Sequence, residues 1–224
     1  MESYKIAILI PAYNEEKTIE KVISKVSLYG DVIVVDDGSN DNTFNIAKNS
    51  KAIVLKNKKN LGYDMSLNNG LKYIIDKNYD YFITFDADNQ HKSSELENFI
   101  NHIYTGSYEA IIGNRSKKNR FSEKIFNLIF NYIYNISDVL CGMKAYNVKI
   151  LKSIHALDYR SSLGTRLILL IAFNKYNIKE IDITVNERDD IARIGGIIKS
   201  NYIIFKTLFK VLIELIFWKK RYAK

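Results

Sequence analysis

The stretch Tyr81–His91, YFITFDADNQH, is the part of the sequence from which the fold can be predicted. Its first half, YFITF, is almost continuously apolar, which is typical of a short strand buried on both faces of a sheet. Its second half places Asp86 and Asp88 two residues apart at the end of that strand. Two carboxylates beside an apolar core lose hydration and repel each other, so the pair predicts a compensating positive charge.

A divalent cation would supply this charge. Mg²⁺ and Mn²⁺ prefer oxygen ligands, and such ions are commonly shared with a substrate diphosphate. Asp86, Asp88 and Gln90 offer three oxygen-bearing side chains on one short segment. The alternative interpretation is a solvated turn closed by Asx-type hydrogen bonds. His91, the next residue, either supports these ligands or only satisfies hydrogen bonds in the core.

Outward from this stretch, apolar strand-like runs alternate with helical patterns. This alternation predicts a mostly parallel sheet with helices on both faces, an α/β fold. The expected strands are 4–10, 31–35, 52–55, 81–85, 109–113 and 178–185, with a loop and a short strand at 138–147; the expected helices begin near residues 15, 41, 65, 93, 121, 161 and 197.

Three polar motifs follow predicted strands: PAYN at 11–14, DDGS at 36–39 and DAD at 86–88. Because the carboxyl ends of parallel strands meet at one edge of a sheet, these motifs predict a ligand site there. Asp36 and Asp37 are candidates to accept hydrogen bonds from a base N–H or a ribose hydroxyl. Taken alone, the DDGS motif is also explained as a capped turn.

The charge of +8 is unevenly distributed along the chain. Residues 1–114 carry 12 Lys/Arg and 16 Asp/Glu, a net −4, whereas residues 115–224 carry 21 and 9, a net +12. A basic half indicates an anionic partner, although a solvated Lys-rich surface would look the same. No recognition-helix or base-stacking motif is evident, so we expect no nucleic-acid partner. The single Cys141 excludes a disulfide scaffold and favours a reducing compartment.

We expect two parts, a domain at 1–195 and an amphipathic basic helix at 196–224. In this helix Lys206, Lys210 and Glu214 form one thin polar stripe, and Trp218 lies near its basic end. A broad apolar face, a basic end and an interfacial Trp suit a helix lying in an anionic membrane surface. A core helix or an interface in a homo-oligomer would show the same pattern.

The motifs PAYNEE, VVDDGSNDNT, NLGYDMSLNNGL, FDADNQH and DVLCGMKAYN occur in this order. As a set they resemble family 2 glycosyltransferases of the GT-A fold, and more narrowly the branch containing dolichyl-phosphate mannose synthase and bacterial polyprenyl-phosphate sugar synthases. The resemblance covers about residues 4–195. It implies a GT-A domain that transfers a sugar from a UDP- or GDP-linked donor.

The resemblance also implies roles for the motif residues. The nucleotide sugar would be bound by Pro11, Tyr13, Asn14, Glu15, Asp36, Asp37, Gly62 and Asp86, with Asp36 and Asp37 on the base and the ribose; Mg²⁺ or Mn²⁺ would be bound against the donor diphosphate by Asp86, Asp88 and Gln90.

Four further residues are matched to the family more loosely. Arg115, in IIGNR, would contact an acceptor or donor phosphate. Arg188, in VNER, matches an Arg in a loop that closes over the donor, and Arg193 is a further candidate because the sequence diverges there. Asp138, in the D-x-x-x-G motif, is the expected general base if the acceptor is a hydroxyl; the alternative interpretation is a structural carboxylate in a turn.

The implied reaction is an inverting, metal-dependent transfer of one sugar to a polyprenyl phosphate at the cytoplasmic face of the membrane, with the enzyme bound peripherally. A lipid phosphate is already ionised and needs no protein base. Two alternatives stay open: transfer to a sugar hydroxyl of a lipid-linked or surface glycan, and an inactive membrane-bound partner protein that keeps the fold.

Overall fold

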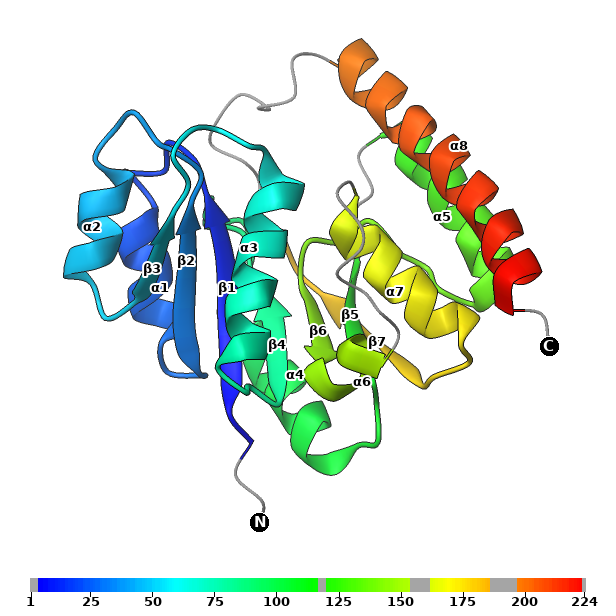
Figure 1. Ribbon diagram of the computed structural model, residues 1–224, viewed down its shortest axis with the longest axis horizontal. Coiled ribbons are helices and arrows are strands. Elements are labelled where there is room, and N and C mark those ends of the chain that lie inside the picture. Colours follow the sequence, from blue (N-terminus) through cyan, green and yellow to red (C-terminus); the bar gives the residue numbers. More distant parts are fainter. Residues whose placement is uncertain (1–3, 117–119, 154–161, 186–196, 223–224) are drawn as a thin grey trace.

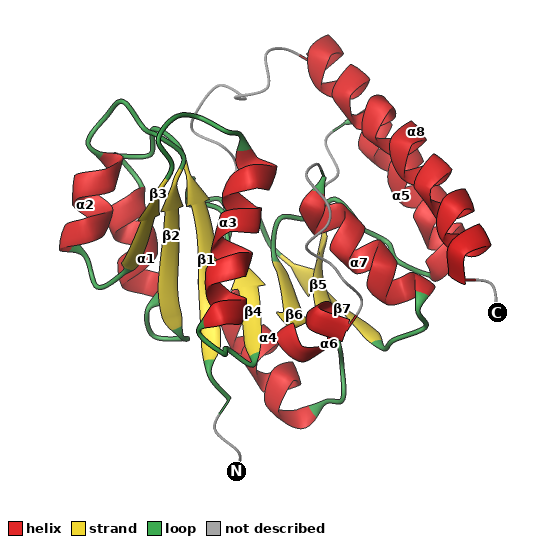
Figure 2. Ribbon diagram, in the orientation of Figure 1, coloured by secondary structure: helices red, strands yellow, loops and turns green. Residues whose placement is uncertain are grey.

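The computed structural model describes residues 4–116, 120–153, 162–185 and 197–222, and in these ranges the chain forms one seven-stranded sheet (Figures 1 and 2). The strand order is β3-β2-β1-β4-β6-β5-β7; β6 runs antiparallel to β4 and β5, and the other neighbours are parallel. The strands are β1 (Ile6–Ala12), β2 (Asp31–Asp36), β3 (Ile53–Lys56), β4 (Tyr81–Thr84), β5 (Ala110–Arg115), β6 (Lys144–Asn147) and β7 (Ile178–Ile183). The predicted α/β class is confirmed.

Helices cover both faces of this sheet. In Figure 1, α3 and α7 lie in front of the strands, whereas α1 lies behind them. The helices are α1 (Ile19–Val26), α2 (Thr43–Asn49), α3 (Tyr63–Asp76), α4 (Glu95–Thr105), α5 (Phe121–Tyr134), α6 (Val148–Ser153), α7 (Leu163–Phe173) and α8 (Ile197–Tyr222). In α1 the buried residues are Ile19, Val22, Ile23 and Val26, a spacing that places one apolar stripe against the sheet.

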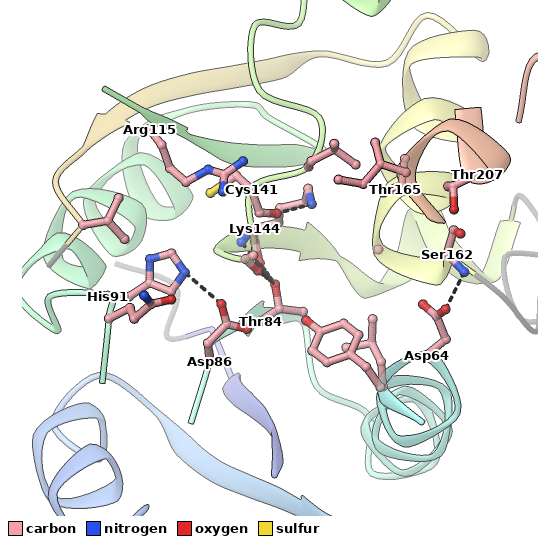
Figure 3. A pocket seen from close by; sticks show the side chains of 18 residues that line it. Asp64, Thr84, Asp86, His91, Arg115, Cys141, Lys144, Ser162, Thr165 and Thr207 are labelled. Atoms are coloured by element: carbon pink, nitrogen blue, oxygen red, sulfur yellow. Dashed lines mark hydrogen bonds and ion pairs between the residues drawn. The ribbon is translucent and has the colours of Figure 1, made fainter. Parts of the chain in front are cut away.

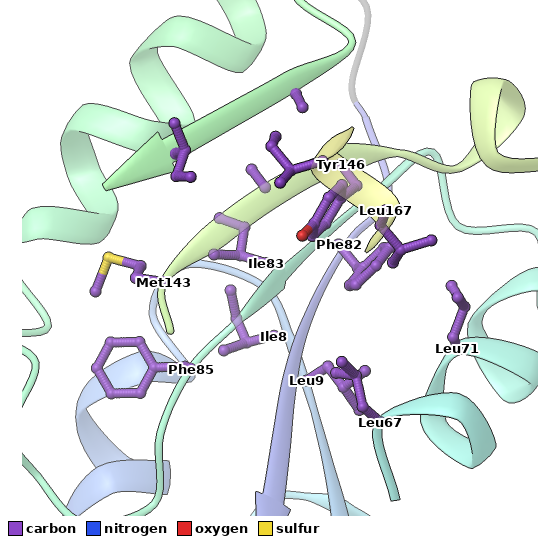
Figure 4. Packing of buried hydrophobic residues seen from close by; sticks show 14 of the residues in the cluster. Ile8, Leu9, Leu67, Leu71, Phe82, Ile83, Phe85, Met143, Tyr146 and Leu167 are labelled. Atoms are coloured by element: carbon purple, nitrogen blue, oxygen red, sulfur yellow. The ribbon is translucent and has the colours of Figure 1, made fainter. Parts of the chain in front are cut away.

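The core between α3 and the sheet is tightly packed (Figure 4). Every residue of β1 is buried. A Cβ added to Gly70 of α3 would overlap the Leu9 side chain and lie 3.1 Å from Val35 Cγ2. The helix therefore lies directly on β1 and β2. Because Ala12 is in register with Asp36 and Leu9 with Thr84, the segments that follow β1, β2 and β4 leave the sheet at one edge.

Helix α8 packs against α5 and α7 with an orientation that the sequence did not predict (Figure 1). Trp218 is 5% exposed, and its ring centroid lies 5.9 Å from that of Phe173 on α7. Glu214 accepts hydrogen bonds of 2.5 Å from Arg166, which is also buried. The predictions of an interfacial Trp218 and of a polar stripe containing Glu214 are therefore wrong, because both side chains face the domain.

The outward side of α8 carries Lys206 and Lys210 among many apolar side chains. Its exposed large side chains are Tyr202, Ile203, Phe205, Phe209, Ile213, Ile216 and Phe217, and the neighbouring α5 exposes Phe121, Leu128, Tyr132 and Ile133. None of the helices in the described ranges combines the length and hydropathy of a membrane-crossing segment. The expected boundary at 195/196 lies outside the described residues.

Candidate active site

Two adjoining cavities open at the edge of the sheet where β1, β2 and β4 end. The β1-side cavity has a volume of about 410 Å³ and is bounded by the segments that follow β1 and β2. The α8-side cavity has a volume of about 370 Å³, and Ile204 and Thr207 of α8 form part of its wall (Figure 3). Tyr63, Asp86 and Gln90 line both cavities. Groups bound in the two cavities would therefore meet at the D-x-D segment.

Most of the predicted donor-binding residues line the β1-side cavity. They are Pro11, Tyr13, Glu15, Asp37, Gly62, Asp86, Asp88 and Gln90. The sequence analysis missed Asn60, Ser66 and Arg120, which line the same cavity. Arg120 had no distinguishing signal, because it lies in a run of basic residues, SKKNR.

Asp37 shapes this cavity by holding the loop before α3. Its carboxylate accepts backbone hydrogen bonds from Leu61 at 2.9 Å and from Gly62 at 2.8 Å, and a side-chain bond from Asn57 at 2.8 Å. Gly62 has φ +89°, a backbone conformation that side chains with a Cβ rarely adopt. This positive φ accounts for the glycine, because a Cβ added at this position would meet nothing within 4 Å.

Two predicted donor-binding residues do not line either cavity. Asn14 is exposed, and its side-chain oxygen accepts a hydrogen bond from the backbone N–H of Asn40 at 3.0 Å, which joins the loops after β1 and β2. Asp36 is 0% exposed, and neither carboxylate oxygen has a hydrogen-bond partner among the described residues. In this structure neither side chain lines a cavity, and their contact with the donor stays a prediction.

Asp86 is fixed in place by His91. His91 Nε2 lies 3.1 Å from Asp86 Oδ2, and His91 is 5% exposed (Figure 3). Burial alone would raise the pKa of Asp86, but the bond from His91 and the nearby charges of Lys144 and Arg115 outweigh burial and lower it. Asp86 is therefore ionised at neutral pH. His91 is the supporting residue that one of the two sequence interpretations described.

The side chains of the D-x-D segment fit a divalent cation of the Mg²⁺ type. Among the described residues, no group of three or more His, Cys, Asp and Glu side chains is close enough to hold a metal ion alone. Asp86, Asp88 and Gln90 instead supply two carboxylates and one amide at the wall of one cavity. Mg²⁺ typically takes one or two carboxylates and completes its coordination with water and substrate phosphates.

Arg115 and Asp138 form a buried ion pair beside the α8-side cavity. Arg115 Nε and Nη2 donate to the two oxygens of Asp138 at 2.7 and 2.9 Å, and the Arg115 backbone N–H adds a bond of 3.1 Å. Asn127 donates to Asp138 as well, at 3.2 Å. Asp138 is 0% exposed and lines neither cavity. This geometry contradicts the expectation that Asp138 is a general base. Asp138 instead holds Arg115, which lines the α8-side cavity.

The two candidates in the closing loop, Arg188 and Arg193, lie outside the described residues. Val185, the last described residue before them, forms an isolated antiparallel bridge with His91. The neighbouring Thr184 donates from its backbone and its hydroxyl to Glu95, at 3.1 and 2.7 Å. Thr184 and Val185 are therefore held next to Glu95 and His91, and His91 is the residue that contacts Asp86.

Gly142 explains why the D-x-x-x-G motif ends in glycine. A Cβ at this position would overlap Asp86 Oδ2 and lie 3.1 Å from Asp86 Cγ. We therefore expect Gly142→Ala to displace the Asp86 carboxylate and to lower the transfer rate roughly 100-fold, the effect of a misplacement of about 1 Å. Asp76→Asn is the control, because Asp76 is exposed at the end of α3 and lines neither cavity. Equal rates for the two variants would contradict this role of Gly142.

Known proteins resemble this chain in sequence over most of its length. The sequence model described as "Glycosyl transferase family 2" matches residues 7–155. UDP-N-acetylglucosamine–dolichyl-phosphate N-acetylglucosaminyltransferase of Methanococcus voltae is 30% identical over 213 residues, which cover 80% of this chain and 84% of that protein. Undecaprenyl-phosphate 4-deoxy-4-formamido-L-arabinose transferase of Shewanella sediminis is 26% identical over 205 residues, 82% of this chain and 59% of that protein.

A solved structure extends the comparison to the fold. Glucosyl-3-phosphoglycerate synthase of Mycobacterium tuberculosis, in complex with Mn²⁺, UDP and glucosyl-3-phosphoglycerate, aligns with a TM-score of 0.75 at 20% identity, covering 95% of this chain and 80% of that one. Fold and site therefore define an enzyme with the GT-A fold that transfers a sugar from a nucleotide sugar. The chain belongs to glycosyl transferase family 2, and its relatives include enzymes named for dolichyl- and undecaprenyl-phosphate acceptors.

Proposed function

We propose that this enzyme transfers one sugar, with inversion, from a nucleotide sugar in the β1-side cavity to the phosphate of a polyprenyl phosphate in the α8-side cavity. The observation that carries the acceptor assignment is the wall of the second cavity. Ile204 and Thr207 form part of this wall, and another side of their helix exposes the apolar side chains Phe209, Ile213 and Ile216. If that exposed side of α8 lies in a membrane surface, the cavity lies close to this surface, where the head group of the lipid is.

The chemistry of the α8-side cavity also favours a phosphate over a hydroxyl. Two described carboxylates line this cavity, and both already accept hydrogen bonds. Asp64 accepts them from the backbone N–H groups of Ser162 and Leu163 at 2.6 and 2.8 Å, and Asp86 accepts one from the His91 ring. A hydroxyl acceptor would need a base at this position. A phosphate acceptor is already anionic and would be attracted by the cations Arg115 and Lys144.

The proposal includes a metal cofactor. Asp86, Asp88 and Gln90 would hold Mg²⁺ or Mn²⁺ in the β1-side cavity, where the ion would neutralise charge on the departing diphosphate. Arg120, at the wall of the same cavity, would add a positive charge to that group. Since the two cavities meet at Asp86 and Gln90, the nucleophile and the leaving group would lie on opposite sides of the sugar, as an inverting displacement requires.

The test is sugar transfer from labelled UDP- and GDP-sugars with Mn²⁺, with and without polyprenyl phosphate. We expect label in the organic phase only when the lipid phosphate is present, and we expect UDP-sugars to be used, as the name of the Methanococcus voltae relative suggests. Transfer to a glycan hydroxyl, with none to the lipid phosphate, would replace this acceptor by the alternative one. Absence of turnover with every donor would favour an inactive partner protein.

We further propose that α5 and α8 bind the enzyme to an anionic membrane surface, at the cytoplasmic face. Phe209 is 68% exposed, so Phe209→Glu is expected to weaken binding to phosphatidylglycerol-containing vesicles roughly 10- to 100-fold, the value of losing one inserted aromatic side chain. Leu28→Glu is the matched control, since Leu28 is 82% exposed on another part of the surface. Co-sedimentation with vesicles measures both. Equal binding of both variants and the wild type would refute the assignment.

A further inference from the structure

Lys144 is a buried lysine of the DVLCGMKAYN motif, and no role was predicted for it from the sequence. It is the first residue of β6, it is 4% exposed, and its side chain lines the α8-side cavity (Figure 3). Its Nζ donates to the backbone carbonyl of Cys141. An ammonium carries three donors, and burying it without a countercharge is unfavourable. The ammonium form of Lys144 therefore needs an anion beside it.

The charges around Lys144 leave this need unmet. Arg115, the other cation of the cavity wall, already has the bidentate partner Asp138, with Glu123 at 3.8 Å from its Nη2. Among the described residues, no carboxylate forms an ion pair with Lys144 Nζ within 4.0 Å. The thiol of Cys141 supplies no charge, because burial raises its pKa to about 12. Burial likewise lowers the pKa of Lys144, the charge of Arg115 acts in the same direction, and the charges of Asp138 and Asp86 act against this shift.

Hydrogen bonds between β4 and β6 fix the backbone of Lys144 near the edge of the sheet where the cavities open. Lys144 of β6 pairs with Thr84 of β4, and Thr84 lies two residues before Asp86 in the sequence. The Lys144 backbone N–H donates to Thr84 Oγ1 at 3.2 Å, and Thr84 Oγ1 donates to the carbonyl of Gly142 at 2.6 Å. A residue on a central strand pair offers a more precise position than one on a loop.

We infer that Lys144 is the residue that binds the phosphate of the acceptor in the α8-side cavity, while Arg115 is oriented and largely neutralised by Asp138. This inference rests on the proposed function, because it assigns the acceptor site of that reaction to one side chain. The acceptor phosphate would supply the countercharge that Lys144 lacks. A neutral polyprenol would supply no such countercharge.

The first experiment measures binding without turnover. Calorimetry with farnesyl phosphate and farnesol compares the wild type, Lys144→Met and Lys149→Met, the last being an exposed lysine on α6. We expect Lys144→Met to bind farnesyl phosphate roughly 10- to 100-fold more weakly, as when a charge-assisted hydrogen bond is lost. Lys144→Met should bind UDP with Mn²⁺ as tightly as the wild type does. Lys149→Met should bind farnesyl phosphate as tightly as the wild type does. Unaltered farnesyl phosphate binding by Lys144→Met would overturn the inference.

A second measurement does not depend on the folding of the Met variant. In the wild type, the ¹³Cε resonance of Lys144, assigned by comparison with Lys144→Arg, should shift on addition of farnesyl phosphate and not of farnesol. Absence of this shift while farnesyl phosphate binds would overturn the role of Lys144 and leave the proposed function standing. If the wild type binds no prenyl phosphate and transfers sugar only to a hydroxyl, the proposed function fails and the inference fails with it.

Discussion

Replacing Asp88 by Asn should lower sugar transfer roughly 1000-fold, because a lost metal ligand removes several kcal/mol of charge stabilisation from the departing diphosphate. Asp88 lines the β1-side cavity together with Asp86 and Gln90, and its Oδ1 accepts the backbone N–H of Gln90 at 3.1 Å. An Asn side chain keeps the size of Asp and one oxygen, so the loss isolates the carboxylate charge. The measurement is the initial rate with saturating donor and Mn²⁺.

The matched control is Asp76→Asn, at the exposed end of α3, away from both cavities. It should transfer sugar at the rate of the wild type. Titration with Mn²⁺ distinguishes weakened metal binding from other causes of a low rate, because Asp88→Asn should need more Mn²⁺ to reach its residual rate. A variant with full activity and an unchanged Mn²⁺ dependence would show that Asp88 is not a metal ligand.

Asp138→Asn is expected to destabilise the protein by about 3–5 kcal/mol, the usual effect of removing one partner of a buried ion pair. Asp138 has no exposed surface and accepts two side-chain bonds from Arg115. An Asn amide would turn N–H donors toward the guanidinium. The free energy of unfolding from urea titration measures the effect, again with Asp76→Asn as the control.

The pH dependence of stability supplies an independent check on Asp138. Burial raises the pKa of Asp138, but its bonds with Arg115 outweigh burial and hold the pKa below the ordinary value. A carboxylate with a lowered folded-state pKa stabilises the fold above the unfolded-state pKa of about 3.9, and this contribution is lost as the pH falls through the lower value. The wild type should therefore lose stability below about pH 4 more steeply than Asp138→Asn. A stable Asp138→Asn variant that fails only in transfer to a hydroxyl would restore the general-base role.

Much of the site could be predicted before the fold was known. The run YFITF and its counterparts in β1 and β2 are continuously apolar, so they had to be buried strands of a parallel sheet. Parallel strands in register bring their carboxyl ends together, which placed Tyr13, Asp37 and Asp88 at one edge. These conclusions depend only on the order and hydropathy of local segments.

The role of each polar side chain could not be predicted in this way, because it depends on contacts between distant segments. Asp36 and Asp37 are neighbours in sequence, yet Asp36 ends β2 with no exposed surface, whereas Asp37 lies just beyond the strand, lines a cavity and accepts hydrogen bonds from the loop before α3. Arg115 and Asp138 are 23 residues apart. Arg166 and Glu214 are 48 residues apart.

The sequence by itself therefore determined the α/β class, the main strands and the D-x-D segment at the end of β4, because the periodicity of a strand is a local property of the chain. Only the tertiary structure decided that Asp138 holds Arg115, that Trp218 faces the domain and that Lys144 is buried in a cavity wall without a described carboxylate partner. The physical reason is that desolvation and ion pairing depend on which side chains the packed helices and strands bring within a few ångströms of one another.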